Sequence, residues 1–353
     1  MKSRFRRRRQ AAAVLVLVFA CLLAIGVTIV DGWVLLLGPR ARALTSRTFE
    51  PTPARLERGK YLTEAVLGCM DCHSRRDWEK ADAPIIPETK AGGAPIPIDD
   101  LPGRIIAPNI SPDVETGAGA WSDDMLARSI REGIGHDGRA LFPLMPYQSF
   151  SSLPDEDLAS VIVYLRSLKP VRNELPGSEI AFPVNLLIKG VPRPITGSVP
   201  EPDMSSDVAR GAFLVKVADC TGCHTPQQKG APVPSLGFGG GFTLTGPFGR
   251  VASANLTPDP SGIPYYDEKM FIQTLRTGHV GARKLSSIMP WQIFKGMSDQ
   301  DLKSVFAYLR TLEPVRHRVD NGEPPTPCKV CGGTHGGGEW NTDEPEPHPS
   351  EDH

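Results

Sequence analysis

The sequence predicts an all-α protein in which two tandem domains follow an N-terminal transmembrane helix. Three observations lead to this fold class: a charge-free apolar run near the N-terminus, an internal repeat, and helical periodicity without a convincing β-hairpin signal. Gly and Pro number 35 each among 353 residues, which indicates long loops. The formal net charge of −1 argues against a protein that binds nucleic acid.

The first element is the predicted membrane anchor at residues 11–37. Residues 1–10 hold six basic side chains and no acid, and residues 11–30 carry no charge. A helix of twenty residues is about 30 Å long, the thickness of the hydrocarbon core. The basic flank predicts a single-pass protein of the bacterial cytoplasmic membrane, with residues 1–10 in the cytoplasm and the domains in the periplasm. A cleaved signal peptide ending at Ala41-Arg42-Ala43 is the alternative, but the apolar run is long for one.

The internal repeat defines the domains. Residues 155–173 and 299–317 are identical at twelve of nineteen positions, and shorter matches precede them in the same order. A period near 146 residues is too long for a solenoid and indicates two copies of one globular domain. The repeat predicts domain 1 at 53–175, a Pro-rich linker at 176–206, domain 2 at 207–318, and an acidic Gly/Pro-rich tail at 319–353 that we expect to be mostly disordered.

Each copy shows the same order of predicted helices. A helix begins near Pro53 in the first copy and near Asp207 in the second. An amphipathic segment follows at 122–131 and at 267–276, closed by a Gly in each copy. The last helix starts after Ser298 in the second copy, where Ser298 and Asp301 resemble a capping box.

A Cys-x-x-Cys-His motif occurs once in each copy, and it is the attachment signature of c-type haem. Two Cys three residues apart can form thioethers with the two vinyl groups of one porphyrin, and the adjoining His then reaches the iron. Two motifs at corresponding positions argue against a zinc or thiol–disulfide pair. The sequence therefore predicts two covalently bound haem c groups, held by Cys69, Cys72, Cys220 and Cys223, with His73 and His224 as iron ligands.

The sixth iron ligand is predicted to be Met145 in domain 1 and Met289 in domain 2. Each lies in a loop and is followed by Pro, which stiffens the segment that presents the sulfur. The aligned pair Met125 and Met270 falls on the amphipathic helix, where Met is more often a core residue. The rival histidines do not align with each other and are interpreted as surface residues: His136 and His279.

At these residues the chain resembles class I cytochromes c, with an N-terminal helix, a haem motif, a distal Met loop and a C-terminal helix. In that family a Gly and an aromatic residue on the first helix cross an aromatic-Leu pair on the last. The resemblance implies two such crossings, Gly59 and Tyr61 with Tyr164 and Leu165, and Gly211 and Phe213 with Tyr308 and Leu309. The longer pattern, which includes 107–113, 121–133 and 145–147, is similar to membrane-associated cytochrome c subunits of periplasmic alcohol and sugar dehydrogenases.

The predicted function is electron transfer, because an iron with six ligands has no position open to substrate. No catalytic residue is assigned. The expected donor is a periplasmic dehydrogenase, another redox protein or quinol, and the expected acceptor is respiratory: a soluble cytochrome, a quinone or a terminal oxidase. A dihaem peroxidase-like enzyme is the alternative, and it would need one vacant or displaceable ligand.

A third Cys-x-x-Cys, Cys328 to Cys331, lacks the His that haem attachment requires, because Gly332 follows it. A local disulfide or an idle thiol pair is the favoured interpretation. A metal site that uses His335 is the alternative, although four good ligands are not evident in the sequence.

Overall fold

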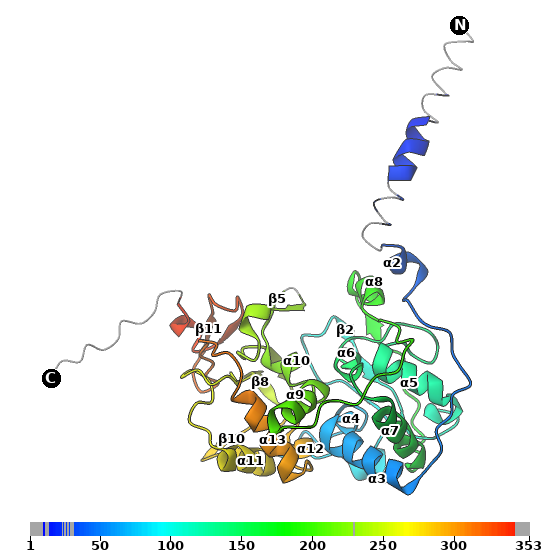
Figure 1. Cartoon of the computed structure of the whole chain (residues 1–353). Coiled ribbons are helices and arrows are strands. Elements are labelled where there is room, and N and C mark those ends of the chain that lie inside the picture. Colours follow the sequence, from blue (N-terminus) through cyan, green and yellow to red (C-terminus); the bar gives the residue numbers. More distant parts are fainter. Residues whose placement is uncertain are drawn as a thin grey trace, which may run out of the picture.

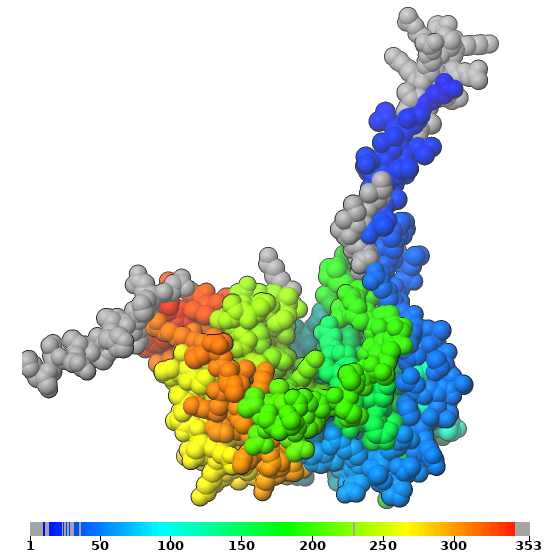
Figure 2. All heavy atoms as spheres, viewed as in Figure 1, coloured from blue at the N-terminus to red at the C-terminus, as the bar shows by residue number. Residues whose placement is uncertain are grey.

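The computed structural model describes residues 10, 14–22, 24, 26, 28, 32–228 and 230–342. Two helical domains lie side by side, and helical residues 14–22 extend away from both (Figures 1 and 2). The residues between the domains run back across domain 1 before the second copy begins.

Domain 1 contains short helices joined by long loops. Its elements are α3 (Pro53–Tyr61), a π-helical turn η1 (Leu62–Val66), α4 (Cys69–Cys72), η2 (Pro87–Thr89), β1 (Ala94–Pro95), β2 (Gly103–Arg104), β3 (Ile106–Ala107), η3 (Ala118–Ala120), α5 (Asp123–Glu132), α6 (Tyr147–Phe150) and α7 (Asp155–Ser167). The linker adds β4 (Glu179–Ile180), α8 (Val184–Leu187) and η4 (Ile188–Gly190).

Domain 2 repeats this order. Its elements are α9 (Asp207–Val217), α10 (Cys220–His224), β5 (Gln227–Gln228), β6 (Ala231–Pro232), η5 (Pro234–Leu236), β7 (Thr243–Gly246), β8 (Gly249–Ala252), α11 (Glu268–Thr277), β9 (His279–Val280), β10 (Arg283–Lys284), α12 (Trp291–Phe294) and α13 (Asp299–Leu309). The C-terminal part adds β11 (Pro325–Pro327), β12 (Thr334–Gly336) and η6 (Gly338–Trp340).

The same helix crossing supports both domains. A Cβ atom on Gly59 of α3 would collide with the Ser160 carbonyl oxygen of α7, and one on Gly211 of α9 would collide with the Ser304 carbonyl oxygen of α13. Glycine is therefore required at both crossings because the two backbones touch.

The helices at these crossings are capped at their N-termini. The side chains of Thr52 and Ser298 accept hydrogen bonds that cap α3 and α13.

The all-α prediction is wrong in that the described residues also form six two-stranded antiparallel sheets. The most regular is the β7–β8 hairpin, in which Thr243 pairs with Ala252 and Gly246 with Gly249. The turn between them has Pro247 at its start and Gly249 at a φ of +81°. Pro and Gly suit a tight turn, but a hairpin this short leaves little period-two pattern to detect.

The prediction of a single-pass membrane anchor at 11–37 is also wrong. Within the described part of the chain, no helix is long and apolar enough to cross a membrane. Near the N-terminus the described helical residues include 14–22, and α2 (Trp33–Leu37) has five residues. Apolar composition indicates a span of roughly 20 residues, but composition alone does not specify a membrane-spanning helix. The predicted location as a single-pass protein of the bacterial cytoplasmic membrane is wrong for the same reason. Residues 1–9, 11–13, 23, 25, 27 and 29–31 lie outside the described residues.

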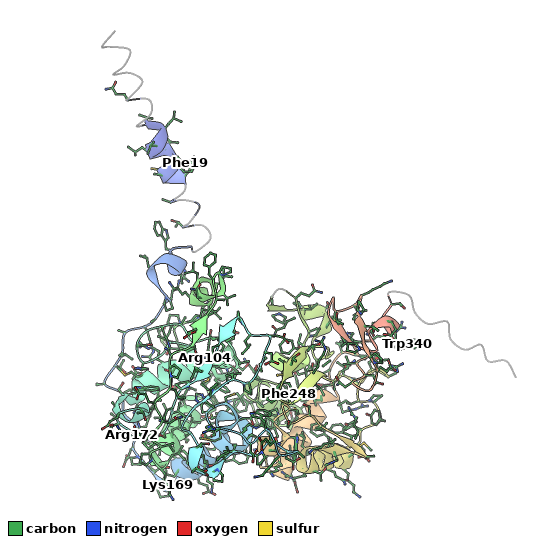
Figure 3. All side chains as sticks on the ribbon, turned by 180° about the vertical axis from the view of Figure 1, so that it is seen from behind. Phe19, Arg104, Lys169, Arg172, Phe248 and Trp340 are labelled. Atoms are coloured by element: carbon green, nitrogen blue, oxygen red, sulfur yellow. The ribbon has the colours of Figure 1, made fainter. Side chains whose placement is uncertain are left out.

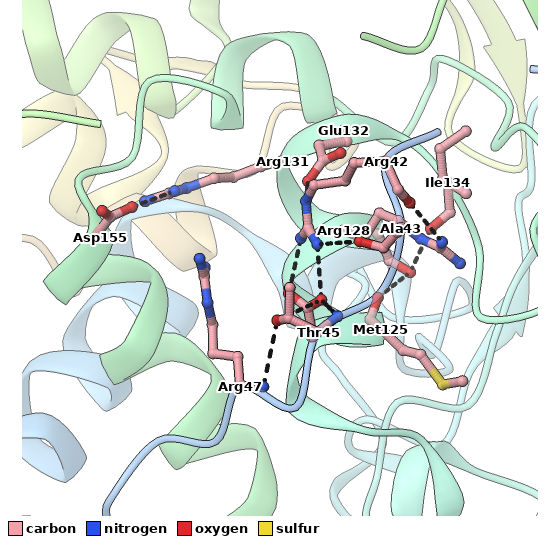
Figure 4. A network of polar contacts seen from close by, with 12 residues as sticks. Arg42, Ala43, Thr45, Arg47, Met125, Arg128, Arg131, Glu132, Ile134 and Asp155 are labelled. Atoms are coloured by element: carbon pink, nitrogen blue, oxygen red, sulfur yellow. Dashed lines mark hydrogen bonds and ion pairs between the residues drawn. The ribbon is translucent and has the colours of Figure 1, made fainter. Parts of the chain in front are cut away.

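The segment after α2 is tied to domain 1 through two buried carboxylates of α5, and Figure 4 shows Arg42 beside one of them, Glu132. Asp124, at the start of α5, accepts hydrogen bonds from both Nη atoms of Arg42 at 2.7 and 2.8 Å, and from the Thr45 backbone at 2.7 Å. Arg42 also pairs with Glu132 at 2.8 Å. These contacts hold residues 42–45 along α5.

The two domains share one hydrophobic core that includes Leu62 and Phe150 from the first and Trp291 and Phe294 from the second. The β7–β8 hairpin of domain 2 also reaches domain 1: the Thr245 carbonyl accepts from the Asp99 N–H at 2.9 Å. Phe248, at the hairpin turn and labelled in Figure 3, lies 5.8 Å from the ring of Trp78.

The tail differs from the predicted disordered segment over residues 319–342. Strands β11 and β12 pair there, and Asn341 exchanges hydrogen bonds with the Arg318 backbone at 2.7 and 2.9 Å. The acidic residues 343–353 lie outside the described residues.

Candidate haem attachment sites

The first Cys-x-x-Cys-His motif forms the short helix α4 and the residue after it. Gly68 precedes it with a φ of +66°, and His73 follows Cys72 directly. One helical turn places Cys69 and Cys72 on the same face, because residues three apart are neighbours on a helix. The geometry thus presents two thiols and an imidazole together.

The second motif repeats this arrangement in α10. Asp219 takes the place of the glycine and adopts a φ of +55°, a conformation that Asp tolerates better than most residues. Cys220, Cys223 and His224 all lie within the helix.

Both imidazoles are held by a backbone carbonyl. The Nδ1 atom of His73 lies 2.8 Å from the Pro108 oxygen, and that of His224 lies 2.7 Å from the Ala254 oxygen. Burial lowers the pKa of both histidines, which favours the neutral ring. Donation from Nδ1 leaves Nε2 with a lone pair for iron, the arrangement that metal-ligating histidines commonly show.

The loops that carry these carbonyls are braced by two buried asparagines. Asn109 donates to the Val171 oxygen at 2.7 Å and accepts from Ser111, and Asn255 donates to the Val315 oxygen at 2.7 Å and accepts from Thr257. The sequence carried the signal, since this loop recurs in both copies, but its role in orienting the histidines emerges only from the fold.

None of the four motif cysteines forms a disulfide. Burial raises the pKa of Cys69, Cys72 and Cys220 to about 12 and that of Cys223 to about 11. Cys72 and Cys223 nevertheless keep solvent-accessible surface, whereas Cys69 and Cys220 are partly buried.

The Met-Pro loops have the same backbone in both domains. The Met145 N–H donates to the Phe142 oxygen and the Met289 N–H donates to the Ser286 oxygen, both at 3.1 Å. Both side chains are partly buried against the core. The axial roles of Met145 and Met289 stay predictions.

Three of the four rival ligands are exposed. Met270 is 38% exposed on α11, whereas Met125 on α5 is partly buried. His136 is exposed and stacks on Trp121 with ring centroids 4.2 Å apart, and His279 is exposed with Nδ1 2.8 Å from the Thr277 oxygen.

An observation independent of the motifs fits a haem. The Tyr147 hydroxyl and the Trp291 Nε1–H are buried and find no hydrogen-bond partner among the described residues. These donors occupy the same position in the two copies, two residues after Met145 and Met289. Two carboxylate propionates on a haem would supply acceptors of the kind these donors lack, and buried donors are otherwise costly.

Each Met loop contacts the other domain beside its haem motif. The Ser149 hydroxyl of α6 donates to Asp219, next to α10, at 2.6 Å. In the opposite direction, Arg76 donates to the Ser287 oxygen, two residues before Met289, at 2.7 Å. Arg76 also pairs with Asp71 of α4 at 2.9 Å. The sequence did not point to Arg76 or Asp219, because their partners in the other domain lie more than 60 residues away.

The comparisons define the class of protein. Residues 208–313 match the family model of cytochrome c, so this part of the chain is a cytochrome c domain, which implies covalently bound haem c.

Three relatives are named as bacterial cytochrome proteins. The fructose dehydrogenase cytochrome subunit of Gluconobacter japonicus is 31% identical, with 79% of this chain and 57% of that protein covered. The gluconate 2-dehydrogenase cytochrome c subunit of Pantoea cypripedii is 30% identical over 73% of this chain and 60% of that protein. A diheme cytochrome c-type protein of Cereibacter sphaeroides is 30% identical over 54% of this chain and 64% of that protein. The predicted resemblance to cytochrome c subunits of dehydrogenases is confirmed, and the chain spans less than two thirds of each of these relatives.

Proposed function

We propose that the chain is a dihaem electron-transfer protein that accepts single electrons from a dehydrogenase and passes them to a respiratory acceptor. The observation that carries the proposal is the reciprocal contact between each Met loop and the other domain's haem motif, through Ser149–Asp219 and Arg76–Ser287. One-electron centres attached to two motifs that these contacts connect would suit electron transfer from one to the other.

The residues assigned to each haem would have two roles, covalent attachment and iron ligation. Cys69, Cys72, Cys220 and Cys223 would hold the two groups through thioethers, and His73, His224, Met145 and Met289 would ligate the irons. When bound, the haem supplies reversible one-electron chemistry at iron. The Pro108 and Ala254 carbonyls fix the imidazole rings, which limits rearrangement when the charge on iron changes.

A carrier role follows from the filled ligand positions. With a His and a Met on each iron, no position remains for substrate or peroxide. Relatives named as cytochrome subunits of fructose and gluconate dehydrogenases support a dehydrogenase as the donor. The acceptor would be a soluble cytochrome, a quinone or a terminal oxidase.

Counting haem per chain tests the two-site assignment. The full chain, expressed with a cytochrome c maturation system, should contain two haems by pyridine haemochrome assay. The double variant Cys220→Ala/Cys223→Ala should contain one, and Cys21→Ser should retain two. A single haem in the unmodified chain would contradict the assignment.

Reduction kinetics test the carrier role. A dehydrogenase that co-purifies with the chain, given its own substrate under anaerobic conditions, should reduce both haems in stopped-flow absorbance. Fast cyanide binding or peroxide turnover at one haem would instead support the dihaem enzyme.

A further inference from the structure

Four buried side chains meet at the C-terminal side of domain 2. His317, Cys328, Cys331 and His335 are each no more than 3% exposed, and their possible ligand atoms all lie within 4.8 Å of one another. We propose that they bind one Zn²⁺ ion in a tetrahedral site that fastens residues 319–342 to domain 2. This site is separate from both haem motifs, and the proposal does not depend on the proposed function.

The distances match the edges of a zinc tetrahedron. The Nε2 atoms of His317 and His335 are 3.2 Å apart, and each lies 3.4 Å from one sulfur, Cys328 and Cys331 respectively. Bond lengths of about 2.0–2.1 Å to nitrogen and about 2.3 Å to sulfur give edges of about 3.3 Å for N–N and about 3.6 Å for N–S. The observed spacing is within a few tenths of an ångström of both values.

Both imidazoles are already oriented for a metal. The Nδ1 atom of His317 lies 2.8 Å from the Gly239 oxygen, and that of His335 lies 3.0 Å from the Gly336 oxygen. Each ring therefore keeps its proton on Nδ1 and turns Nε2 toward the cluster, as ligating histidines do.

The Cys328–Cys331 turn is shaped to hold thiolates. Backbone N–H groups of Cys331 and Gly333 point at the Cys328 and Cys331 sulfurs, at 3.5 and 3.3 Å. Gly332 adopts a φ of +70° that lets the chain turn around the sulfurs. Both cysteines are free thiols. On zinc binding, each thiol would release its proton to solvent and its sulfur would donate a lone pair to the ion.

Domain 1 provides an internal comparison for His317. The aligned residue is Asn173, whose side chain donates to the Gly92 oxygen at 2.8 Å, and Gly92 aligns with Gly239. In domain 1, one hydrogen-bond donor to this glycine carbonyl is enough, and the Asn173 amide supplies it. His317 adds a second nitrogen, Nε2, and that nitrogen faces two thiols and another imidazole.

The tail buries only a small apolar core. Its own buried cluster consists of Leu236 with the two cysteines, packed against three valines. Ordering each residue costs about 1–2 kcal/mol of backbone entropy, so a segment of some twenty residues needs more than so small a core supplies. A structural zinc site is a common source of the missing stability.

The test is metal analysis of the full-length, haem-loaded protein after exhaustive dialysis. One zinc per chain is expected, with two sulfur and two nitrogen neighbours in X-ray absorption at the zinc edge. His317→Asn, which copies domain 1 and keeps the donor to Gly239, should lower zinc occupancy at least tenfold, as should Cys331→Ser. Unchanged haem absorption in these variants would show that domain 2 still folds.

Two matched controls separate the site from general effects. His279→Asn removes an exposed histidine of the same domain, and Cys21→Ser removes a cysteine outside the cluster, so both should keep one zinc per chain. Chelation of zinc should also speed proteolysis within 319–342 without loss of haem. Absence of zinc with two titratable thiols, or a Cys328–Cys331 disulfide seen as a loss of two protons in the intact mass, would overturn the proposal.

Discussion

At the residue scale, single polar contacts decide how the predicted ligands are presented. One carbonyl orients each proximal imidazole, and one asparagine braces each of the loops that carry these carbonyls. The Met side chains are presented differently, by a Pro and a turn in the backbone. Substitutions at the Met positions should therefore change the iron ligand and leave the surrounding core in place.

Met145→Ala and Met289→Ala test the axial ligands one domain at a time. Each variant should lose half of the long-wavelength band that Met-ligated ferric haem shows, because sulfur no longer reaches one iron. Met270→Ala removes an exposed sulfur and is the control, since the band should be unchanged. An intact band in either of the first two variants would contradict the ligand assignment.

The environment of Asp124 leads us to expect that the protein loses stability in acid. Burial opposes its ionisation, but hydrogen bonds from Arg42 and Thr45 outweigh burial and lower its pKa to about 2. A lowered folded-state pKa stabilises the protein above the unfolded value near 3.8, and this contribution is lost as pH falls from about 4 to about 2. The effect is on the order of 2 kcal/mol.

Chemical denaturation as a function of pH measures this effect. Arg42→Gln should destabilise the protein near neutral pH and flatten the loss of stability below pH 4. Arg55→Gln breaks an ion pair with Glu156, which is 59% exposed, and should change stability little. An equal effect of both substitutions would argue against a special role for Asp124.

At the scale of elements, the crossings of α3 with α7 and of α9 with α13 define the domains. Gly59→Ala and Gly211→Ala should each cost about 1–3 kcal/mol or more, because the new methyl group meets a backbone carbonyl that cannot move alone. Gly177→Ala, in the linker with open space around it, should be nearly neutral. Thermal unfolding of the three variants would measure whether the substitutions at the two crossings lower the stability equally.

The helices could be predicted because their signals are local. Thr52 and Ser298 cap the helices that their sequence indicates, and the repeat marks equivalent elements in both copies. Tyr61 behaves otherwise: its hydroxyl hydrogen bonds to Asp301 and accepts from the Ser298 N–H of the other domain at 3.0 Å, so it serves the interface. The sequence offered a metal site with Cys328, Cys331 and His335 as an alternative, but it did not reveal the fourth ligand, His317, which lies in the repeat eleven residues before Cys328. Only the fold turns this side chain toward the other three.

At the scale of the whole molecule, the shared core and the polar contacts between domains join the two copies into one unit. Arg76 is central, since it is 9% exposed and contacts Asp71, the Ser287 carbonyl and the Trp78 ring. Its removal would leave Asp71 without its nearest positive charge.

Arg76→Met should therefore destabilise the protein by about 3–5 kcal/mol, as loss of one partner of a buried ion pair does. Adding Asp71→Asn should restore part of the stability, because the uncompensated charge is then gone. A double-mutant cycle in chemical denaturation measures the coupling. Strictly additive losses would show that the two side chains act separately.

The hydrogen bond that Asn173 and His317 each make to the same carbonyl position has a consequence for how the two copies differ. An amide and an imidazole serve equally well as the domain's own contact here, since both side chains can donate to the glycine carbonyl. The imidazole therefore offers its second ring nitrogen to a further partner at no cost to that contact. The first copy shows the arrangement without that partner, so the protein carries an internal reference for the tail site within one chain.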